Sequence, residues 1–527
     1  MAESYDFIII GGGSAGCVLA ARLTEDPAAK VLLLEAGGRD RHPFYHLPAG
    51  FAKMTKGIGS WGWQTVPQRH MNGMAIRYTQ ARVIGGGSSI NAQIYTRGAA
   101  QDYDDWRQMG CAGWGYDDVL PYFRKAEDND TWDNRFHGKG GPMGVSKPAA
   151  PLPICEAYFK AAGQLGIPFN DDMAGERQDG VGYYQLTQRN VRRSSASIAY
   201  LNPNRGRGNL TIRTSAQVLR IVVENHRAVG VEMPEGVIRA EAEVILASGA
   251  IGSPRLLQLS GIGPADHLAQ LGIPVVLDQP QVGANLQDHL DLFVIAECTG
   301  PHTYDRYAKP HWSALAGLQY LLMRRGPVAS SLFETGGFWY ADADARSPDI
   351  QFHLGLGSGI EAGVAAMPQG GVTLNSAYLR PRSRGTVRLA SADPAAAPLI
   401  DPNYWADPHD REMSIRGLKL AQEIMRQDAL KPFVKAERLP GPEVRTEDDY
   451  FRYACAHAKT DHHPAGTCRM GMDPGAVVDP ELRFNGIAAL RVIDASIMPA
   501  LVSSNTNATA IMIGEKGADL VRLAHGI

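Results

Sequence analysis

The chain has 527 residues, of which 44 % are hydrophobic and 20 % charged, and its formal net charge is −3 at pH 7. This is an ordinary globular composition with material for a sizeable core, and the slightly acidic balance excludes a partner held mainly through nucleic-acid phosphates. The six cysteines are scattered and never form a C-x-x-C pair, so a disulfide framework is not expected.

The first predicted elements are a strand, a glycine turn, a helix and a second strand. Residues 5–10 (YDFIII) and 30–37 (KVLLLEAG) are apolar runs typical of buried strands, and residues 17–26 (CVLAARLTED) have helical periodicity. Residues 11–16 (GGGSAG) fill the G-x-G-x-x-G pattern between the first strand and the helix. This order is typical of a unit that binds a dinucleotide.

Each glycine of this turn has a physical role. Gly11 permits the tight turn, Gly13 lets a pyrophosphate approach the backbone, and Gly16 lets the helix pack closely on the strand. The helix N-terminus attracts the pyrophosphate, and the Glu35 carboxylate can accept hydrogen bonds from ribose hydroxyls. FAD and NAD(H) both fit this motif, whereas Glu35 argues against a cofactor with a 2′-phosphate.

Two more glycine-rich stretches follow. ARVIGGGSSIN (residues 81–91) exposes backbone N–H groups, which suits a contact with phosphate or an isoalloxazine edge, or else a flexible loop. In residues 243–263, an apolar strand runs into a glycine turn, and a helix is expected to start near Pro254. Returning strands of this kind often complete a nucleotide-binding sheet.

Other parts of the chain have alternating or aromatic-rich strand patterns, as in FETGGFWYADA and DIQFHLGLG, with helices such as residues 411–427 between them. They predict an antiparallel sheet, so we expect a mixed α/β protein with a Rossmann-like domain interleaved with a substrate domain. The expected nucleotide-binding domain comprises residues 1–150 with a cofactor-contact loop at 81–98, residues 206–295 and residues 455–527. The expected substrate domain comprises residues 151–205 and 296–454.

Near the end of the chain, residues 490–499 (LRVIDASIMP) form an apolar strand that runs into Asp494, and a polar turn and long helix occupy residues 503–524. Asn505 and Asn507 lie where this helix begins. There, backbone N–H groups and the helix dipole favour developing negative charge. The alternative interpretation is that these asparagines only cap the helix.

The stretch HHPAGTCRMG (residues 462–471) permits three interpretations: a metal site, part of a catalytic pair, or a structural turn. Neighbouring histidines on an extended turn point in different directions, and no second His or Cys pair with ligand spacing follows, so no metal is expected. Cys468 lacks the partners of an acyl-transfer nucleophile. His462 is expected to be a structural or rim residue.

Four motifs in this order resemble the glucose–methanol–choline (GMC) family of flavin oxidoreductases, and the resemblance spans essentially the whole chain. They are the N-terminal glycine motif, ARVIGGGSSIN with its downstream YTRG, GAIGSPRLLQLSGIG, and HHPAGTCRMG followed by VVDPELRFNGIAALRVIDASIMP and SSNTNA. Within the family, GFAKMT (residues 50–55), GGGSSINA and GPVAS (residues 326–330) are similar to the choline-dehydrogenase-like branch, and most of all to bacterial FAD-dependent sorbose dehydrogenases.

The resemblance implies FAD as the cofactor and, as the substrate, a primary alcohol, a polyol or a sugar-type alcohol such as sorbose. It assigns the base to His463, the second active-site position to Asn507, and a place near the flavin pyrimidine ring to Asn505. Some choline oxidases attach FAD through a histidine at the position of Ile90, so FAD is expected to be noncovalent here. The further cofactor contacts that the resemblance implies are Val83, Gly87, Asn91, Val218, Asp494 and Ala495.

An alcohol carbon gives up a hydride readily only when its hydroxyl proton leaves, so a base must lie within hydrogen-bond reach of that proton. A neutral imidazole with a pKa near about 6.5 suits this role, and His463 is expected to supply it. Asn507 is expected to hold the substrate oxygen so that the alcohol carbon lies near flavin N5, which takes the hydride. Glu334 is expected either to line the substrate cavity or to be a buried structural carboxylate.

The leading expectation is an FAD-dependent alcohol dehydrogenase with a quinone, a dye-like carrier or oxygen as electron acceptor. The alternatives are an oxygen-using oxidase of aryl-alcohol or hydroxymethylfurfural type, a choline-type dehydrogenase, a hydroxynitrile lyase, and a nucleotide-binding protein without catalytic activity. The sequence shows no secretory signal and no apolar run of about 18 residues, which predicts a cytoplasmic protein. Peripheral attachment to a membrane is left open.

Overall fold

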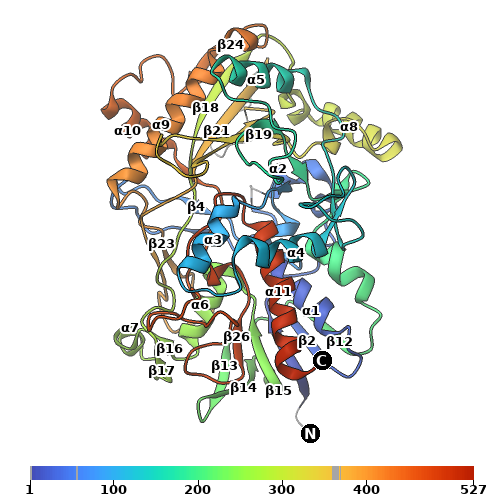
Figure 1. Ribbon diagram of the computed structural model, residues 1–527, viewed down its shortest axis with the longest axis vertical. Coiled ribbons are helices and arrows are strands. Elements are labelled where there is room, and N and C mark those ends of the chain that lie inside the picture. The colour runs from blue at the N-terminus through green and yellow to red at the C-terminus, as the bar shows by residue number, and fades with distance from the viewer. Residues whose placement is uncertain (1–2, 55–56, 359–366, 368) are drawn as a thin grey trace.

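The computed structural model describes residues 3–54, 57–358, 367 and 369–527, and Figure 1 shows it with its long axis vertical. A largely parallel sheet with its helices forms the lower half, where both termini lie, and an antiparallel sheet with its helices forms the upper half (Figure 1). Thr55, the last residue of the GFAKMT stretch, lies outside the described residues.

The lower sheet joins strands from three distant parts of the chain. Its order is β12-β2-β1-β15-β14-β13, and β26 pairs with β15. The pairs of β1, β2, β12, β15 and β26 are parallel, whereas β13 and β14 form an antiparallel extension from β15. This Rossmann-like arrangement confirms the expected fold. The strands are β1 (Ser4–Ile10), β2 (Val31–Glu35), β12 (Leu210–Thr214), β13 (Arg220–Glu224), β14 (Arg227–Met233), β15 (Gly236–Leu246) and β26 (Leu490–Val492).

Two helices from opposite ends of the chain cover this sheet side by side (Figure 1). α1 (Ser14–Leu23) and α11 (Asn507–His525) approach closely at Gly514, where a Cβ would lie 3.0 Å from the backbone oxygen of Ala15. The sequence placed the start of another helix near Pro254, but α6 begins earlier and contains this proline. The other helices here are α3 (Ala100–Gln108), α4 (Tyr116–Ala126), α6 (Gly249–Leu259) and α7 (Ala265–Gln270).

The upper sheet is antiparallel throughout, with the order β24-β18-β21-β20-β19-β8, and β25 pairs with β18. α9 packs on β18 and β21, and α5 contributes to the same core. The strands are β8 (Gly180–Tyr183), β18 (Leu290–Cys298), β19 (Thr335–Trp339), β20 (Ile350–Gly355), β21 (Gly371–Tyr378), β24 (Val434–Leu439) and β25 (Lys459–Thr460). The helices are α5 (Pro153–Gln164), α9 (Pro408–Met425) and α10 (Glu447–His457).

Two strands of the upper sheet cross the expected domain limits. β18 begins at Leu290, before the expected start of the substrate domain at residue 296, because its buried residues form one continuous run to Cys298. β25 lies after residue 454, where the substrate domain was expected to end. The division into domains itself stays a prediction.

The remaining strands lie outside the two large sheets. These strands and the remaining α-helices are α2 (Phe51–Met54), α8 (Pro310–Met323), β3 (Trp63–Gln64), β4 (Arg77–Tyr78), β5 (Ile94–Tyr95), β6 (Glu127–Asn129), β7 (Met143–Val145), β9 (Gln185–Leu186), β10 (Gln188–Arg189), β11 (Arg192–Arg193), β16 (Ile262–Gly263), β17 (Leu277–Asp278), β22 (Thr386–Arg388) and β23 (Leu399–Asp401).

Candidate active site

A cavity of about 560 Å³ extends from the lower sheet to residues of the upper one. It begins where β1, β2 and β15 end, which is the edge at which parallel sheets of this type bind ligands. Gly11, Gly13 and Glu35 line this end, and His463 lines the cavity together with residues of the upper sheet such as His353. The cavity therefore brings the N-terminal glycine motif and the C-terminal histidine motif into one site.

The glycine turn has the shape that its spacing predicted. Gly11 has φ +105°, and a Cβ there would lie 2.5 Å from the oxygen of Ala247, while a Cβ on Gly16 would lie 1.9 Å from the oxygen of Gly11. Both positions therefore exclude a side chain. A Cβ on Gly13 would meet only one atom, at 3.7 Å, so the backbone at the start of α1 is open to the cavity.

Glu35 ends β2 as a buried carboxylate that also lines the cavity. Its Oε2 accepts a hydrogen bond from the N–H of Gly12 at 2.9 Å, and its Oε1 accepts one from the N–H of Gly37 at 2.6 Å. Burial raises the pKa of this carboxyl, although the two backbone donors oppose that shift. Each oxygen keeps a further lone pair, so the carboxylate can accept ribose hydroxyls as expected.

The second glycine stretch packs against the first. A Cβ on Gly86 would lie 2.6 Å from Cα of Gly13, whereas nothing lies within 4 Å of a Cβ on Gly87, which lines the cavity. The buried guanidinium of Arg193 donates to the side chain of Asn91 at 2.7 Å and so fixes this cavity-lining residue. Val83 does not line the cavity. It packs in a small apolar cluster with Tyr45, Met54 and Ile90.

Asp494 lines the cavity and ties its own turn to the glycine-rich start of α6. Its carboxylate accepts hydrogen bonds from the N–H of Gly249 at 2.9 Å and from Ser253 Oγ at 2.5 Å, and it caps its own turn by accepting from the N–H of Ser496. Burial raises its pKa. The next residue along the chain lines the cavity, as does a residue of the segment between β12 and β13. These two residues are Ala495 and Val218.

His463 is buried and pairs with a second histidine that the sequence analysis missed. Its Nδ1 lies 3.0 Å from Nδ1 of His289, whose Nε2 lies 3.1 Å from the carbonyl oxygen of Leu379. A carbonyl can only accept, so His289 carries its proton on Nε2. Burial lowers the pKa of His289 to about 3, so its Nδ1 is bare and accepts from Nδ1–H of His463. The remaining nitrogen of His463, Nε2, is therefore unprotonated.

The electrostatics of the site keep this base neutral. Burial, and then the neighbouring His289 and His353 rings, lower the pKa of His463 well below 6.5. The backbone N–H of His463 donates to Asp288 at 2.8 Å, so the segment that carries the second histidine also holds the base in place. A neutral imidazole with a lone pair on Nε2 is the form that removes a proton.

His462 was expected to be a structural or rim residue on an extended turn, and the structure corrects only the extended backbone. Its φ of +63° makes the chain left-handed there rather than extended, so adjacent side chains do not alternate. The ring is exposed to the cavity and lines it together with His463. Thr460 supports this conformation by accepting the N–H of His462 at 2.8 Å.

The two asparagines have different neighbours. Asn505 Nδ2 lies 3.1 Å from Nε2 of His463, and its Oδ1 accepts from Gln351 at 2.9 Å. Asn507, the first residue of α11, accepts from Ser14 Oγ at 2.8 Å at the first turn of α1. Both line the cavity. The amide beside the base thus belongs to Asn505, whereas Asn507 faces the glycine motif.

Two other residues singled out from the sequence lie outside the cavity. Glu334 is fully buried, and burial raises its pKa to about 7, although contacts with Ser330 and Ser331 oppose the shift. Its neighbour Phe333 lines the cavity instead. Cys468 is buried, and burial raises its pKa well above the usual range, so the thiol stays protonated.

Charged side chains lie beside the histidines. Lys459 lines the cavity, and its ammonium lies 2.5 Å from Asp291 Oδ2 and 3.9 Å from Asp461. Asp461 also lies 3.7 Å from His353. Among the described residues, no group of three or more His, Cys, Asp or Glu side chains has the arrangement of a metal site.

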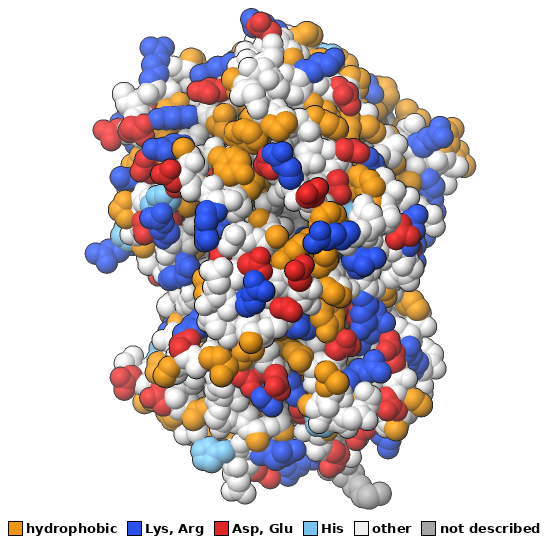
Figure 2. All heavy atoms as spheres, viewed as in Figure 1, with side chains coloured by type: hydrophobic (Ala, Val, Ile, Leu, Met, Phe, Trp, Pro, Cys, Tyr) orange, Lys and Arg blue, Asp and Glu red, His pale blue; other side chains and the backbone are white. Residues whose placement is uncertain are grey.

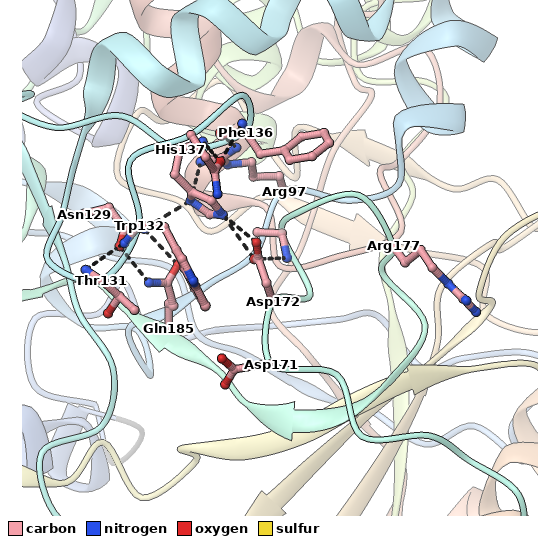
Figure 3. A network of polar contacts seen from close by, with 12 residues as sticks. Arg97, Asn129, Thr131, Trp132, Phe136, His137, Asp171, Asp172, Arg177 and Gln185 are labelled. Atoms are coloured by element: carbon pink, nitrogen blue, oxygen red, sulfur yellow. Dashed lines mark hydrogen bonds and ion pairs between the residues drawn. The ribbon is translucent and has the colours of Figure 1, made fainter.

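A buried charged network supports the cavity wall from outside. His137 Nδ1 lies 2.8 Å from Glu127 and its Nε2 lies 3.0 Å from Asp172, so both ring nitrogens face carboxylates (Figure 3). Arg97 pairs with Glu127. Burial lowers the pKa of His137, but the bonds to Asp172 and Glu127 outweigh it and raise the pKa. Thr96, next to Arg97, contacts the asparagine beside the base, so the network helps to fix that amide.

The FAD that the sequence resemblance implies fits the residues present. Gly13 and Gly87 offer backbone without a side chain at the cavity wall, and Glu35 lies at the far end. In the described part of the structure, Asn507 Nδ2 is buried without a hydrogen-bond partner. Since buried polar groups are nearly always paired, this amide is suited to an acceptor atom of a bound group.

Comparison with known proteins agrees with this site. Two family models described as GMC oxidoreductase match residues 5–291 and 381–514. Human mitochondrial choline dehydrogenase is 42 % identical over 99 % of this chain and 90 % of its own length. An alcohol dehydrogenase (acceptor) of Pseudomonas putida is 40 % identical over 98 % of this chain and 95 % of its own. The crystal structure of pyridoxine 4-oxidase from Mesorbium loti, 33 % identical, superposes with a TM-score of 0.90 over 99 % of both chains.

Proposed function

This chain belongs to the GMC oxidoreductase family, and we propose that it oxidises an alcohol to its carbonyl with His463 as the base. It is an FAD-dependent oxidoreductase that acts on CH–OH groups. Bound FAD supplies the acceptor for the hydride that leaves the alcohol carbon. The observation that carries the proposed role of His463 is its bare Nε2, which the pair with His289 leaves unprotonated.

The proposed chemistry of the protein's own residues is a proton transfer and a positioning step. His463 Nε2 accepts the hydroxyl proton as the alcohol carbon loses its hydride. An amide N–H₂ near that nitrogen holds the substrate oxygen, which fixes the carbon relative to the acceptor. The contact at 3.1 Å favours Asn505 for this role, and the sequence resemblance favours Asn507. The two variants are compared below.

For the substrate class, we propose a neutral alcohol of the primary-alcohol, polyol or sugar type, such as sorbose. The support is the ammonium of Lys459, which lines the cavity and is paired with Asp291. A quaternary ammonium beside it would meet a like charge. Choline is the second candidate. Relatives named choline dehydrogenase are about as similar to this chain as the relative named alcohol dehydrogenase is, and Asp461 and Phe293 also line the cavity.

The electron acceptor is proposed to be a quinone or a dye-like carrier, which makes the enzyme a dehydrogenase. The alternative is an oxidase, because solved structures named pyridoxine 4-oxidase and aryl-alcohol oxidase share the fold at 33 % and 26 % identity. A hydroxynitrile lyase is the remote alternative. FAD is proposed to be noncovalent and the protein cytoplasmic.

The test mixes the holoenzyme with a panel of alcohols without oxygen and follows the flavin absorption band. We expect sorbose, other polyols or simple primary alcohols to bleach the band, and choline to do so much more slowly. Oxygen, a quinone and a dye are then added in separate samples to identify the acceptor. A flavin that stays oxidised with every alcohol while a cyanohydrin is cleaved would overturn the proposed oxidation. Bleaching by choline alone would overturn only the proposed substrate class.

A further inference from the structure

A helix on the surface of the upper half gathers large apolar side chains that face solvent. In the described part of the chain, thirteen such side chains are exposed, and five of them lie within the last nine residues of α8. Two are 72 % and 71 % exposed. Solvent exposure of this extent in one continuous segment is uncommon in a protein without a partner surface. The five residues are Leu315, Leu318, Leu321, Leu322 and Met323.

The helix is anchored on its opposite side only. Ala316 and Tyr320 are buried, and the hydroxyl of Tyr320 donates to the carbonyl of Val191 at 2.7 Å. Leu315 and Leu322, two turns apart, share the outer face of the helix. The fold thus holds the helix by a narrow inner stripe and leaves an apolar outer face uncovered.

Cations flank this apolar face at both ends. The sequence from Arg306 to Arg325 contains four Lys or Arg and no Asp or Glu. Lys309 and Arg324 are the other two, and all four are exposed and without an ion-pair partner in the described structure. Figure 2 shows basic and apolar side chains together at the upper right, where Figure 1 places α8. The guanidinium of Arg306 also lies over the ring of Trp312, at 5.3 Å.

We propose that α8 and its flanking cations dock this protein on the surface of an anionic lipid bilayer. Leucines that enter the boundary below the headgroups, with Lys and Arg on the phosphates, are the composition of an interfacial helix. α8 has 14 residues, and crossing the hydrocarbon core takes about 20. None of the helices in the described residues combines the length and apolar character that crossing a bilayer requires. The helix therefore lies on the membrane.

Charge complementarity favours a bilayer over a second copy of the chain. A symmetric dimer through α8 would bring cations of one copy close to cations of the other, because both ends of the segment 306–325 are basic and the segment contains no Asp or Glu. An anionic lipid surface offers phosphates to all of these cations at once, worth about 1 kcal/mol for each Lys or Arg near the surface.

The position of α8 relates the docked surface to the cavity. The chain runs from α8 through a short turn at residues 327–329 to Phe333, which lines the cavity. Phe333 meets Phe51, another lining residue, edge to face at 5.8 Å. Docking through α8 would therefore bring this aromatic side of the cavity near the bilayer.

The experiment is sedimentation of the holoenzyme with vesicles of phosphatidylcholine alone or with phosphatidylglycerol. We expect binding to the anionic vesicles and little to the neutral ones. Leu321→Glu/Leu322→Glu and Arg324→Glu/Arg325→Glu should each weaken binding by at least tenfold, since they remove apolar burial and headgroup attraction respectively. The matched controls lie at the lower end of the molecule. They are Leu523→Glu, which is 80 % exposed on α11, and Lys30→Glu/Arg227→Glu.

The control variants should bind like the unmodified protein, and all variants should keep their flavin spectrum. A parent protein that ignores anionic vesicles would overturn the proposal, as would α8 variants that bind unchanged. Light scattering without vesicles tests the competing occupant. A second copy of the chain covers this face if three results are found together: the parent is a dimer, the α8 variants are monomers, and neither the parent nor the variants bind vesicles.

Discussion

The Nδ1 atoms of His289 and His463 lie 3.0 Å apart in a buried imidazole pair. The carbonyl of Leu379 holds the proton of His289 on Nε2, so only His463 can supply the proton between the two rings. His463 is thereby fixed in the tautomer whose bare Nε2 is available as a base. A side chain 174 positions away in sequence thus determines which nitrogen can act.

The first prediction concerns this pair. His289→Leu removes the acceptor for Nδ1–H of His463, so the tautomer with a proton on Nε2 becomes populated. We expect FAD to be retained and anaerobic flavin reduction to slow by roughly ten- to a hundredfold, less than the full loss of a base. His289→Gln offers an amide oxygen as a substitute acceptor and should recover part of the rate. Equal rates in both variants and the parent would contradict the tautomer argument.

A second prediction separates the two asparagines. If the amide near His463 Nε2 holds the substrate oxygen, Asn505→Ala should slow flavin reduction by about tenfold or more, with FAD occupancy unchanged. Asn507→Ala should mainly weaken FAD retention, because this amide faces the first turn of α1. Stopped-flow reduction and flavin content after dialysis give the two readouts. The opposite pattern would return the catalytic role to Asn507.

The parts of this protein that sequence predicts well are those set by local spacing. The positions of Gly11, Gly13, Gly16 and Glu35 follow from one strand-turn-helix-strand unit, since each role depends on its place in that turn. Gly11, Gly13 and Glu35 line the end of one cavity, and Gly16 packs against the backbone of Gly11 within the turn. The antiparallel patterns likewise predicted a second sheet.

The parts that sequence missed depend on distant pairing or on backbone conformation. His289 meets His463 because β25 pairs with β18, a long-range contact with no local signal. His462 lines the cavity because its φ is +63°, which no pattern of residue types reveals. Glu334 lies outside the wall while its neighbour Phe333 lines it, and this one-residue difference depends on the backbone before β19, which residue types do not reveal.

A third prediction concerns cofactor attachment. Ile90 cannot form a histidyl link, so FAD is expected to be released when the protein is precipitated with acid, and the yellow colour should stay in the supernatant. Glu35→Ala should weaken FAD retention further while the order of preferred alcohols stays the same, because Glu35 lies at the end of the cavity far from His463. Flavin in the pellet would contradict the first expectation, and full occupancy of the variant after long dialysis the second.

A fourth prediction concerns the buried network of His137. Its folded pKa is raised above the unfolded value of about 6.5, so its stabilising effect is fully present below about pH 6.5 and is lost as pH rises through the folded pKa. His137→Gln leaves Asp172 without its cation and Glu127 with Arg97 alone, and it should destabilise the holoenzyme by about 1–3 kcal/mol at pH 6. The difference in unfolding free energy should shrink by pH 9.

Denaturant unfolding at both pH values measures this difference. His525→Gln is the control, because His525 contacts a single carboxylate, Glu243, and is partly exposed. It should cost no more than about 1 kcal/mol. A deficit of His137→Gln that grows from pH 6 to pH 9 would show that His137 is neutral in the folded protein.

The last prediction concerns the adjacent histidines of the HHPAGT stretch. His463→Ala removes the proposed base and should slow anaerobic flavin reduction by about a hundred- to ten-thousandfold while FAD stays bound. His462→Ala enlarges the same cavity without touching the pair with His289, so it should alter KM and the preference among alcohols while changing the limiting rate of reduction by less than about tenfold. Lower pH should not restore His463→Ala, because the missing group accepts a proton rather than donating one. If His462→Ala abolished reduction and His463→Ala reduced flavin at the parental rate, the base would be the other histidine, and the tautomer argument from His289 would fail with it.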